Sequence, residues 1–199
     1  MAKARAKRGA SVGVAENGNS AVLVTVAPGG EVLDRRTIDL TRDLPTHPYH
    51  HEGSWAVGRY VGSPWARKIS LPEAIALVER VREAAALGAR AGLEALAAAV
   101  PLPIGHIALR ACPTLPATTE ERIADTRAAN VADSVMYREA LATAAAARGW
   151  SVHWYEREPA LHDAAIERAV RAMGRAAGPP WQAKHKLAAA AALALTPPG

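Results

Sequence analysis

Residues 11–40 read SVGVAENGNSAVLVTVAPGGEVLDRRTIDL, and this stretch decides the fold. Its segments 11–15, 21–27 and 31–40 are rich in β-branched residues, which suit the strands of a pleated sheet. The joints between them, Glu16-Asn17-Gly18-Asn19 and Pro28-Gly29-Gly30, contain residues that accept the positive φ of tight turns. The stretch therefore predicts an antiparallel β-meander of three strands.

Helices and strands alternate after the meander. Ser70-Leu71-Pro72-Glu73 is a capping box with proline just inside the start, and apolar residues at helical spacing follow as far as Val100. Further elements are expected as a strand at 104–109, a helix over at least 131–148, a strand at 150–156, and helices at 162–176 and 184–195. The strand-helix-strand unit requires a right-handed crossover and parallel pairing of its two strands.

The length of 199 residues fits one ordinary domain. We expect a basic flexible arm at 1–10, a single domain at 11–195 with a long loop at 41–68, and a tail at 196–199. The single Cys112 excludes a disulfide framework, and no secretion signal opens the chain, which favours the reducing cytoplasm. The longest apolar run, 187–195, is far shorter than the roughly 20 residues of a membrane span, so no membrane partner is expected.

The chain is basic, with 24 Lys and Arg against 19 Asp and Glu and a formal net charge of +5. Four of the cations lie in the first eight residues: Lys3, Arg5, Lys7 and Arg8. A flexible basic arm can neutralise phosphates and add salt-dependent affinity for nucleic acid. The alternative interpretation of the same residues is a solvated leader.

The element order β-β-β-α-β-α-β-α-α resembles that of the ribonuclease H-like superfamily, and residues 11–195 resemble in particular the RuvC-type crossover-junction resolvases. The likeness is carried by residues 12–18, 137–155 and 185–195. It implies an α/β fold with a mixed sheet, in which an antiparallel meander is followed by parallel strands and helices cover both faces. It also implies a nucleic-acid partner and a possible homodimer, because a four-way junction is two-fold symmetric.

Nucleases of this family hold two Mg²⁺ or Mn²⁺ ions with three or four carboxylates, at the edge where the parallel strands end. The resemblance puts Glu16 at the first acidic position. However, the fourth strand ends in Arg110, and the acidic place on the last helix is taken by His185 or an alanine such as Ala188. The acidic set is thus incomplete, and the candidate catalytic residues are Glu16, Glu52, Asp125 and His185.

The segment His47-Pro48-Tyr49-His50-His51-Glu52 is the densest cluster of possible metal ligands. Three imidazoles and a carboxylate suit a transition metal or acid-base chemistry near neutral pH. The spacing matches no zinc motif, so contact with phosphate or nucleobases, and plain loop packing, stay open as alternatives. Together with Glu16, the metal candidates are His50, His51 and Glu52.

Nucleic-acid contact is expected from Arg110, Lys184 and Lys186, with Trp55 and Trp65 as possible stacking platforms for bases. Loop aromatics can instead anchor a loop to the body of the domain. Three functions remain open: a metal-dependent nuclease of structured or branched nucleic acid, a catalytically degenerate module that binds nucleic acid or a partner, and a function on this fold unrelated to nucleic acid.

Overall fold

A computed structural model of the chain describes residues 9–49, 69–156 and 163–195. Its five-stranded sheet has the order β3-β2-β1-β4-β5. The strands are β1 (Ala10–Asn17), β2 (Ser20–Val26), β3 (Val32–Asp39), β4 (Ile104–Arg110) and β5 (Ser151–Tyr155). Strands β1, β2 and β3 pair antiparallel, whereas β4 pairs parallel with both β1 and β5. The predicted meander and the predicted parallel unit are both confirmed.

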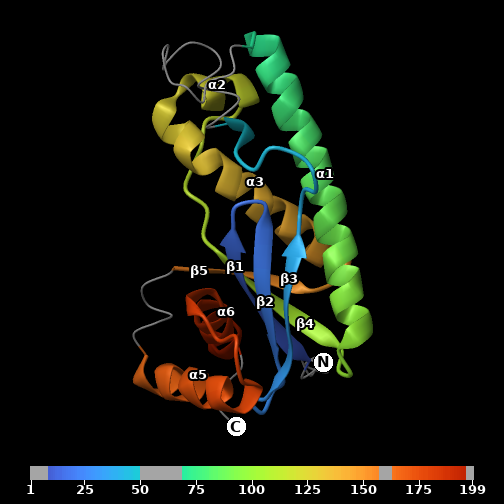
Figure 1. The fold of residues 1–199 in the computed structure, drawn as a ribbon, viewed down its shortest axis with the longest axis vertical. Helices are drawn as coiled ribbons and strands as arrows, with labels where there is room; N and C mark the ends of the chain where they lie inside the picture. The colour runs from blue at the N-terminus through green and yellow to red at the C-terminus, as the bar shows by residue number, and fades with distance from the viewer. Residues whose placement is uncertain (1–8, 50–68, 157–162, 196–199) are drawn as a thin grey trace, which may run out of the picture.

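Five helices are described, and Figure 1 shows their arrangement around the sheet. They are α1 (Leu71–Ala99), α2 (Thr119–Ala124), α3 (Thr126–Ala147), α5 (Ala164–Ala177) and α6 (Ala183–Ala194). The predicted capping box opens α1, since Ser70 and Glu73 each accept a hydrogen bond from the backbone of the other. Helix α1 continues through Gly88, where a Cβ would lie 2.2 Å from the carbonyl oxygen of Leu40. This glycine lets α1 pass close to the end of β3.

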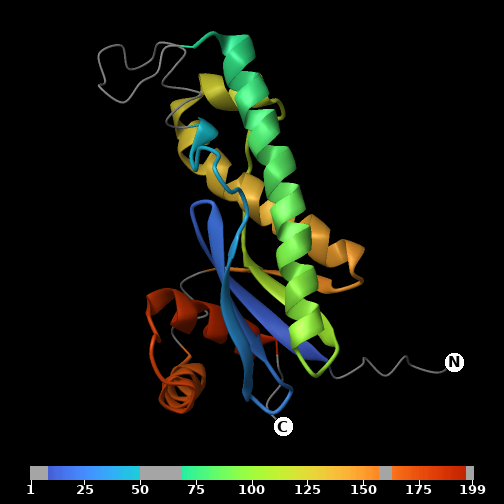
Figure 2. The same ribbon diagram turned by 45° about the vertical axis from the view of Figure 1, so that its right-hand side comes forward.

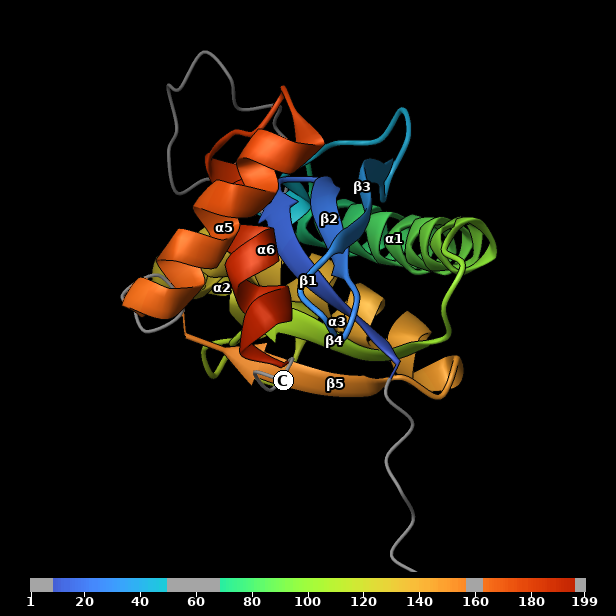
Figure 3. The same ribbon diagram turned by 90° about the horizontal axis from the view of Figure 1, so that it is seen from below.

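The helices form two layers, one on each face of the sheet. Helices α1 and α3 pack with Val12, Val14, Ile107 and Leu109 in the larger core, while α5 and α6 pack with Ala15, Val24 and Val26 in a smaller one. Figures 2 and 3 show the two layers from the side and from below. The fold is ribonuclease H-like, as the sequence predicts.

Helix α6 lies unusually close to β1. A Cβ at Gly13 would lie 1.8 Å from the carbonyl oxygen of Ala188 and 2.7 Å from the amide nitrogen of Ala192. The helix face against the sheet is made of alanines that are fully buried, so no long side chain separates the two backbones. The glycine in the central strand and the alanines of the helix together allow the two backbones to come this close.

Arg35 of β3 fastens the connection between α5 and α6 to the sheet. Its Nη1 donates to the carbonyl oxygens of Gly178 and Pro180, both at 2.7 Å, and its Nη2 donates to that of Pro179 at 2.9 Å. These carbonyls follow the C-terminal end of α5, where a cation is favourable. The contact fixes the position from which α6 starts.

None of the described helices is both long and apolar enough to cross a membrane. The expectations that fall on Glu52, His50, His51, Trp55 and Trp65 lie outside the described residues, as does the basic arm up to residue 8.

We expect Gly13→Ala to destabilise the protein by about 2–3 kcal/mol, because the new methyl group forces α6 away from β1. Urea unfolding of both proteins measures the difference. Gly29→Ala is the matched control, because a Cβ at Gly29 meets nothing within 4 Å, and its stability should stay within about 1 kcal/mol of wild type. Equal effects of the two substitutions would contradict the close contact.

Candidate functional site

The ends of β1 and β4 meet at one edge of the sheet. The two strands are parallel, and Gly13 is paired with Ala108, so Glu16 and Arg110 both lie just beyond the paired region. Sites in open α/β sheets gather at this carboxyl edge. The structure therefore brings these two predicted residues to the same edge.

Glu16 and Arg110 nevertheless lie on opposite faces of the sheet. Side chains alternate along a strand. Val12 and Val14 belong to the core beneath α1 and α3, so Glu16 turns toward α3. Leu109 belongs to the same core, so Arg110 turns toward the α6 side. On that side β1 ends in Ala15 and β4 ends in Arg110, and neither is a carboxylate.

Glu16 forms an ion pair with Arg138, a residue of α3. Nε of Arg138 donates to Oε1 of Glu16 at 2.9 Å, and Nη2 donates to the same oxygen. Nη1 donates to the carbonyl oxygen of Ala111 at 3.0 Å, so Arg138 joins β1 to the exit of β4. Only 12% of the Glu16 side chain and 6% of the Arg138 side chain are exposed. The carboxylate is thus neutralised inside the protein.

Cys112 lies beside this ion pair. Burial raises the pKa of its thiol, although the charge of Arg138 acts in the opposite direction. The thiol is therefore protonated at neutral pH and is a weak nucleophile there.

Helix α6 brings a cation to the same edge. Nζ of Lys184 donates to the carbonyl oxygen of Glu16. Lys186 lies about 200° further around the helix, where it lines a groove with residues of α5. Of the two predicted lysines, the structure therefore brings only Lys184 to Glu16.

His185 is engaged at the start of α6. Its Nδ1 accepts a hydrogen bond from the backbone nitrogen of Gln182 at 3.2 Å, and its ring stacks on Trp181 with 5.9 Å between centroids. Burial, followed by the charge of Arg35, lowers the pKa of His185. This histidine is neutral at pH 7 and closes the first turn of the helix.

Asp125 caps α3. Its Oδ1 accepts hydrogen bonds from the backbone nitrogens of Arg127 at 2.8 Å and Ala128 at 3.3 Å. Arg138 lies roughly 20 Å further along the helix axis. The structure therefore does not bring Asp125 together with Glu16, which is ion-paired to Arg138.

The described residues do not fit a two-metal site. Mg²⁺ and Mn²⁺ require carboxylate oxygens, whereas the carboxylate of Glu16 is bound by Arg138 and the carbonyl oxygen of the same residue is bound by Lys184. Within the part of the chain that the structure describes, no three residues of the types His, Cys, Asp and Glu are grouped so that they could hold a metal ion. A role of His50, His51 and Glu52 in metal binding stays a prediction.

A second polar cluster surrounds Asp133, a residue that was not among the predicted site residues. Nδ1 of His47 lies 3.5 Å from Oδ2 of Asp133, and the backbone nitrogen of Tyr49 donates to Oδ1 at 3.0 Å. The carboxylate is 5% exposed and lies on the buried side of α3, between Ala132 and Met136. In the sequence, Asp133 could have been recognised as an acidic residue on the apolar side of a helix.

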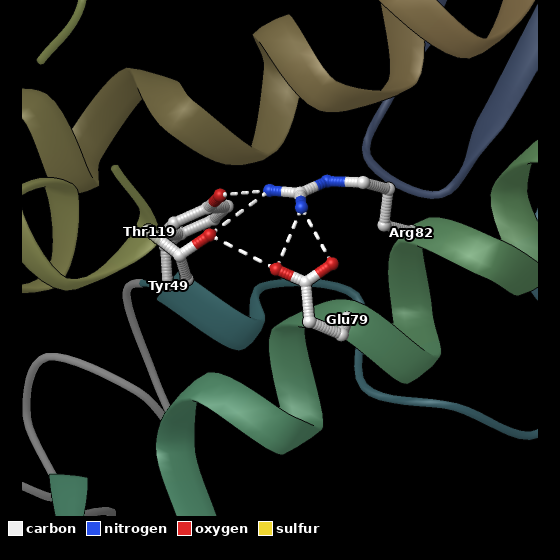
Figure 4. A network of polar contacts seen from close by, with 4 residues as sticks. All are labelled: Tyr49, Glu79, Arg82 and Thr119. Carbon is white, nitrogen blue, oxygen red and sulfur yellow. Dashed lines mark hydrogen bonds and ion pairs between the residues drawn. The ribbon is translucent and has the colours of Figure 1, made fainter. Parts of the chain in front are cut away.

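Tyr49 is fully buried and belongs to a network that joins α1 to the start of α2 (Figure 4). Arg82 donates from Nη2 to the hydroxyl of Tyr49 at 2.8 Å and from Nη1 to both carboxylate oxygens of Glu79 at 2.6 Å. The Thr119 hydroxyl donates to Glu79 at 3.0 Å and accepts from Arg82 at 3.2 Å. Every charged group of this network is paired, so its role is to hold residue 49 against the two helices.

No family model matches the sequence, and a search of curated proteins finds no match either. Among solved structures, the chain is similar to RuvC of Thermus thermophilus, with 13% sequence identity and a TM-score of 0.47. The similarity covers 92% of this chain and 91% of that one. The fold itself is established by the strand order and by the pairing directions described above.

Arg138→Met should destabilise the protein by about 3 kcal/mol, because it leaves the Glu16 carboxylate buried without a partner. The double variant Glu16→Gln/Arg138→Met should recover most of this loss, since neither buried charge remains. Urea unfolding of the wild type, Arg138→Met, Glu16→Gln and the double variant gives the coupling energy of the two side chains. A coupling energy near zero would show that the two side chains do not interact.

Proposed function

We propose that this chain is a nucleic-acid-binding module on the ribonuclease H-like fold that does not use two-metal hydrolysis. The Glu16–Arg138 ion pair carries the proposal. It neutralises the Glu16 carboxylate, so the cations of this edge that can still contact an anion are Arg110 and Lys184. An edge with this chemistry favours phosphate over divalent cations.

Two cations at this edge, Arg110 and Lys184, have hydrogen-bond donors that an anion could use. Arg110 is partly exposed, and its guanidinium has no hydrogen-bond or ion-pair partner among the described residues. Lys184 donates one hydrogen bond to the carbonyl of Glu16, which leaves two of its three ammonium donors for other acceptors. Arg110 on β4 and Lys184 on α6 would each contact a phosphate of the bound strand.

The overall charge supports the same function. The net charge of +5 and the four cations in residues 1–8 provide attraction at longer range, which is independent of sequence and sensitive to salt. Base stacking on Trp55 and Trp65 would add affinity for single strands and stays a prediction. We therefore expect phosphate contacts to dominate the binding.

The nuclease activity that the resemblance implies would need Glu16 to leave Arg138 and join other acidic groups. Among its candidate partners, Asp125 caps a distant helix end and His185 is held by Gln182 and Trp181. Glu52 lies outside the described residues. Nuclease activity is therefore tested separately from binding, by cleavage of the same substrates.

Fluorescence polarisation with labelled single-stranded, duplex, hybrid and four-way-junction substrates tests the proposal over a range of salt concentrations. We expect affinity to fall linearly with salt on logarithmic axes. Arg110→Ala/Lys184→Ala should weaken binding to all substrates alike and reduce the salt slope by about 2, which corresponds to two lost phosphate contacts.

The matched control is Arg80→Ala/Arg90→Ala, which removes two exposed cations from α1 on the opposite face of the sheet. It should keep nearly the full slope. A wild-type protein that binds none of the substrates at low salt would overturn the proposal. Cleavage with Mn²⁺ that is lost in Glu16→Gln would establish the nuclease instead.

A further inference from the structure

On the sheet face that α6 covers, the helices among the described residues leave β4 and β5 largely uncovered. Helix α6 packs on β1 and β2 and barely reaches β4, as Figure 3 shows. His106 and Ala108 lie on this face of β4, because the alternate residues Ile107 and Leu109 are in the opposite core. Parallel pairing brings His153 of β5 beside Ala108, and both histidines are partly exposed.

The two histidines meet across the strands. Nδ1 of His106 lies 3.2 Å from Nε2 of His153, with 5.3 Å between the ring centroids and 56° between the ring planes. One nitrogen of each ring is therefore within hydrogen-bond distance of the other. The strands on both sides fix this geometry, since β4 and β5 are paired over His106–Arg110 and Ser151–Tyr155.

This separation matches the spacing of two metal ligands. Imidazole nitrogens bind Zn²⁺ at about 2.0–2.1 Å, so two of them at a tetrahedral angle are roughly 3.3 Å apart. The observed separation of 3.2 Å is close to this value. A hydrogen bond between two neutral imidazoles has a similar length, and an experiment can distinguish the two roles.

We propose that His106 and His153 together bind one borderline transition-metal ion of the class Zn²⁺, Co²⁺, Ni²⁺ or Cu²⁺, with water in the remaining positions. Imidazole favours this class over Mg²⁺ and Mn²⁺. The site is distinct from the Glu16 edge and does not depend on nucleic-acid binding. Having two protein ligands, it should bind more weakly than a structural zinc site, which has four.

Isothermal titration of the full chain without an affinity tag, using Zn²⁺ at pH 7.5, tests the proposal. We expect one ion per chain and a higher Tm with the metal. His106→Gln and His153→Gln should each weaken binding at least about tenfold and leave the metal-free Tm nearly unchanged. Visible absorption with Co²⁺ should show the imidazole-bound ion in wild type and lose that signal in both variants.

Two further variants separate this site from other histidines. His185→Gln should bind like wild type, because that ring is held against Trp181 on another element. His50→Gln/His51→Gln should also bind like wild type. The proposal is overturned if wild type shows no saturable binding, if His106→Gln and His153→Gln keep full affinity, or if only the His50→Gln/His51→Gln variant loses it.

Discussion

The ion pair between Glu16 and Arg138 holds together the edge of the sheet where β1 and β4 end. A carboxylate at the end of the central strand is buried, and burial is tolerable only with a partner of opposite charge and good hydrogen bonds. Arg138 supplies both, and it also reaches the carbonyl of Ala111 where β4 ends. The same contact that fixes α3 against the sheet also occupies the carboxylate, so that it is not available to a metal ion. The contact that stabilises this edge of the sheet therefore also determines whether the Glu16 carboxylate can bind a ligand.

Much of the fold could be predicted from residues 11–40 and from helix periodicity, because turn chemistry and capping boxes are local. The arrangement at the sheet edge was only partly predictable. The position of Glu16 at the end of a strand follows from the sequence, and the alternation of Val12 and Val14 even indicates its face. Its partner does not follow, since Arg138 is far away in the chain and meets Glu16 only after α3 has crossed the sheet.

Histidines illustrate the same limit. The cluster around His47 stands out in the sequence, yet His47 lies against Asp133, which resembled an ordinary helix residue. His106 and His153 belong to separate strands and form no motif, but parallel pairing brings their nitrogens to 3.2 Å. Proximity in sequence is a poor guide to convergence of side chains, whereas strand register is a good one. Register depends on packing of the entire sheet and cannot be read from either strand alone.

Among the described strands, β3 and β5 form the two edges of the sheet, and the edge at β3 carries charged side chains. Strand β3 carries Asp34, Arg35 and Arg36, with Arg36 and Asp34 paired at 2.6 Å and Arg35 committed to the linker before α6. Another strand that approached this edge would have to displace or desolvate these groups, which discourages aggregation through backbone pairing. Strand β5, at the other edge, has only five residues. Self-association by sheet extension along β3 is therefore disfavoured.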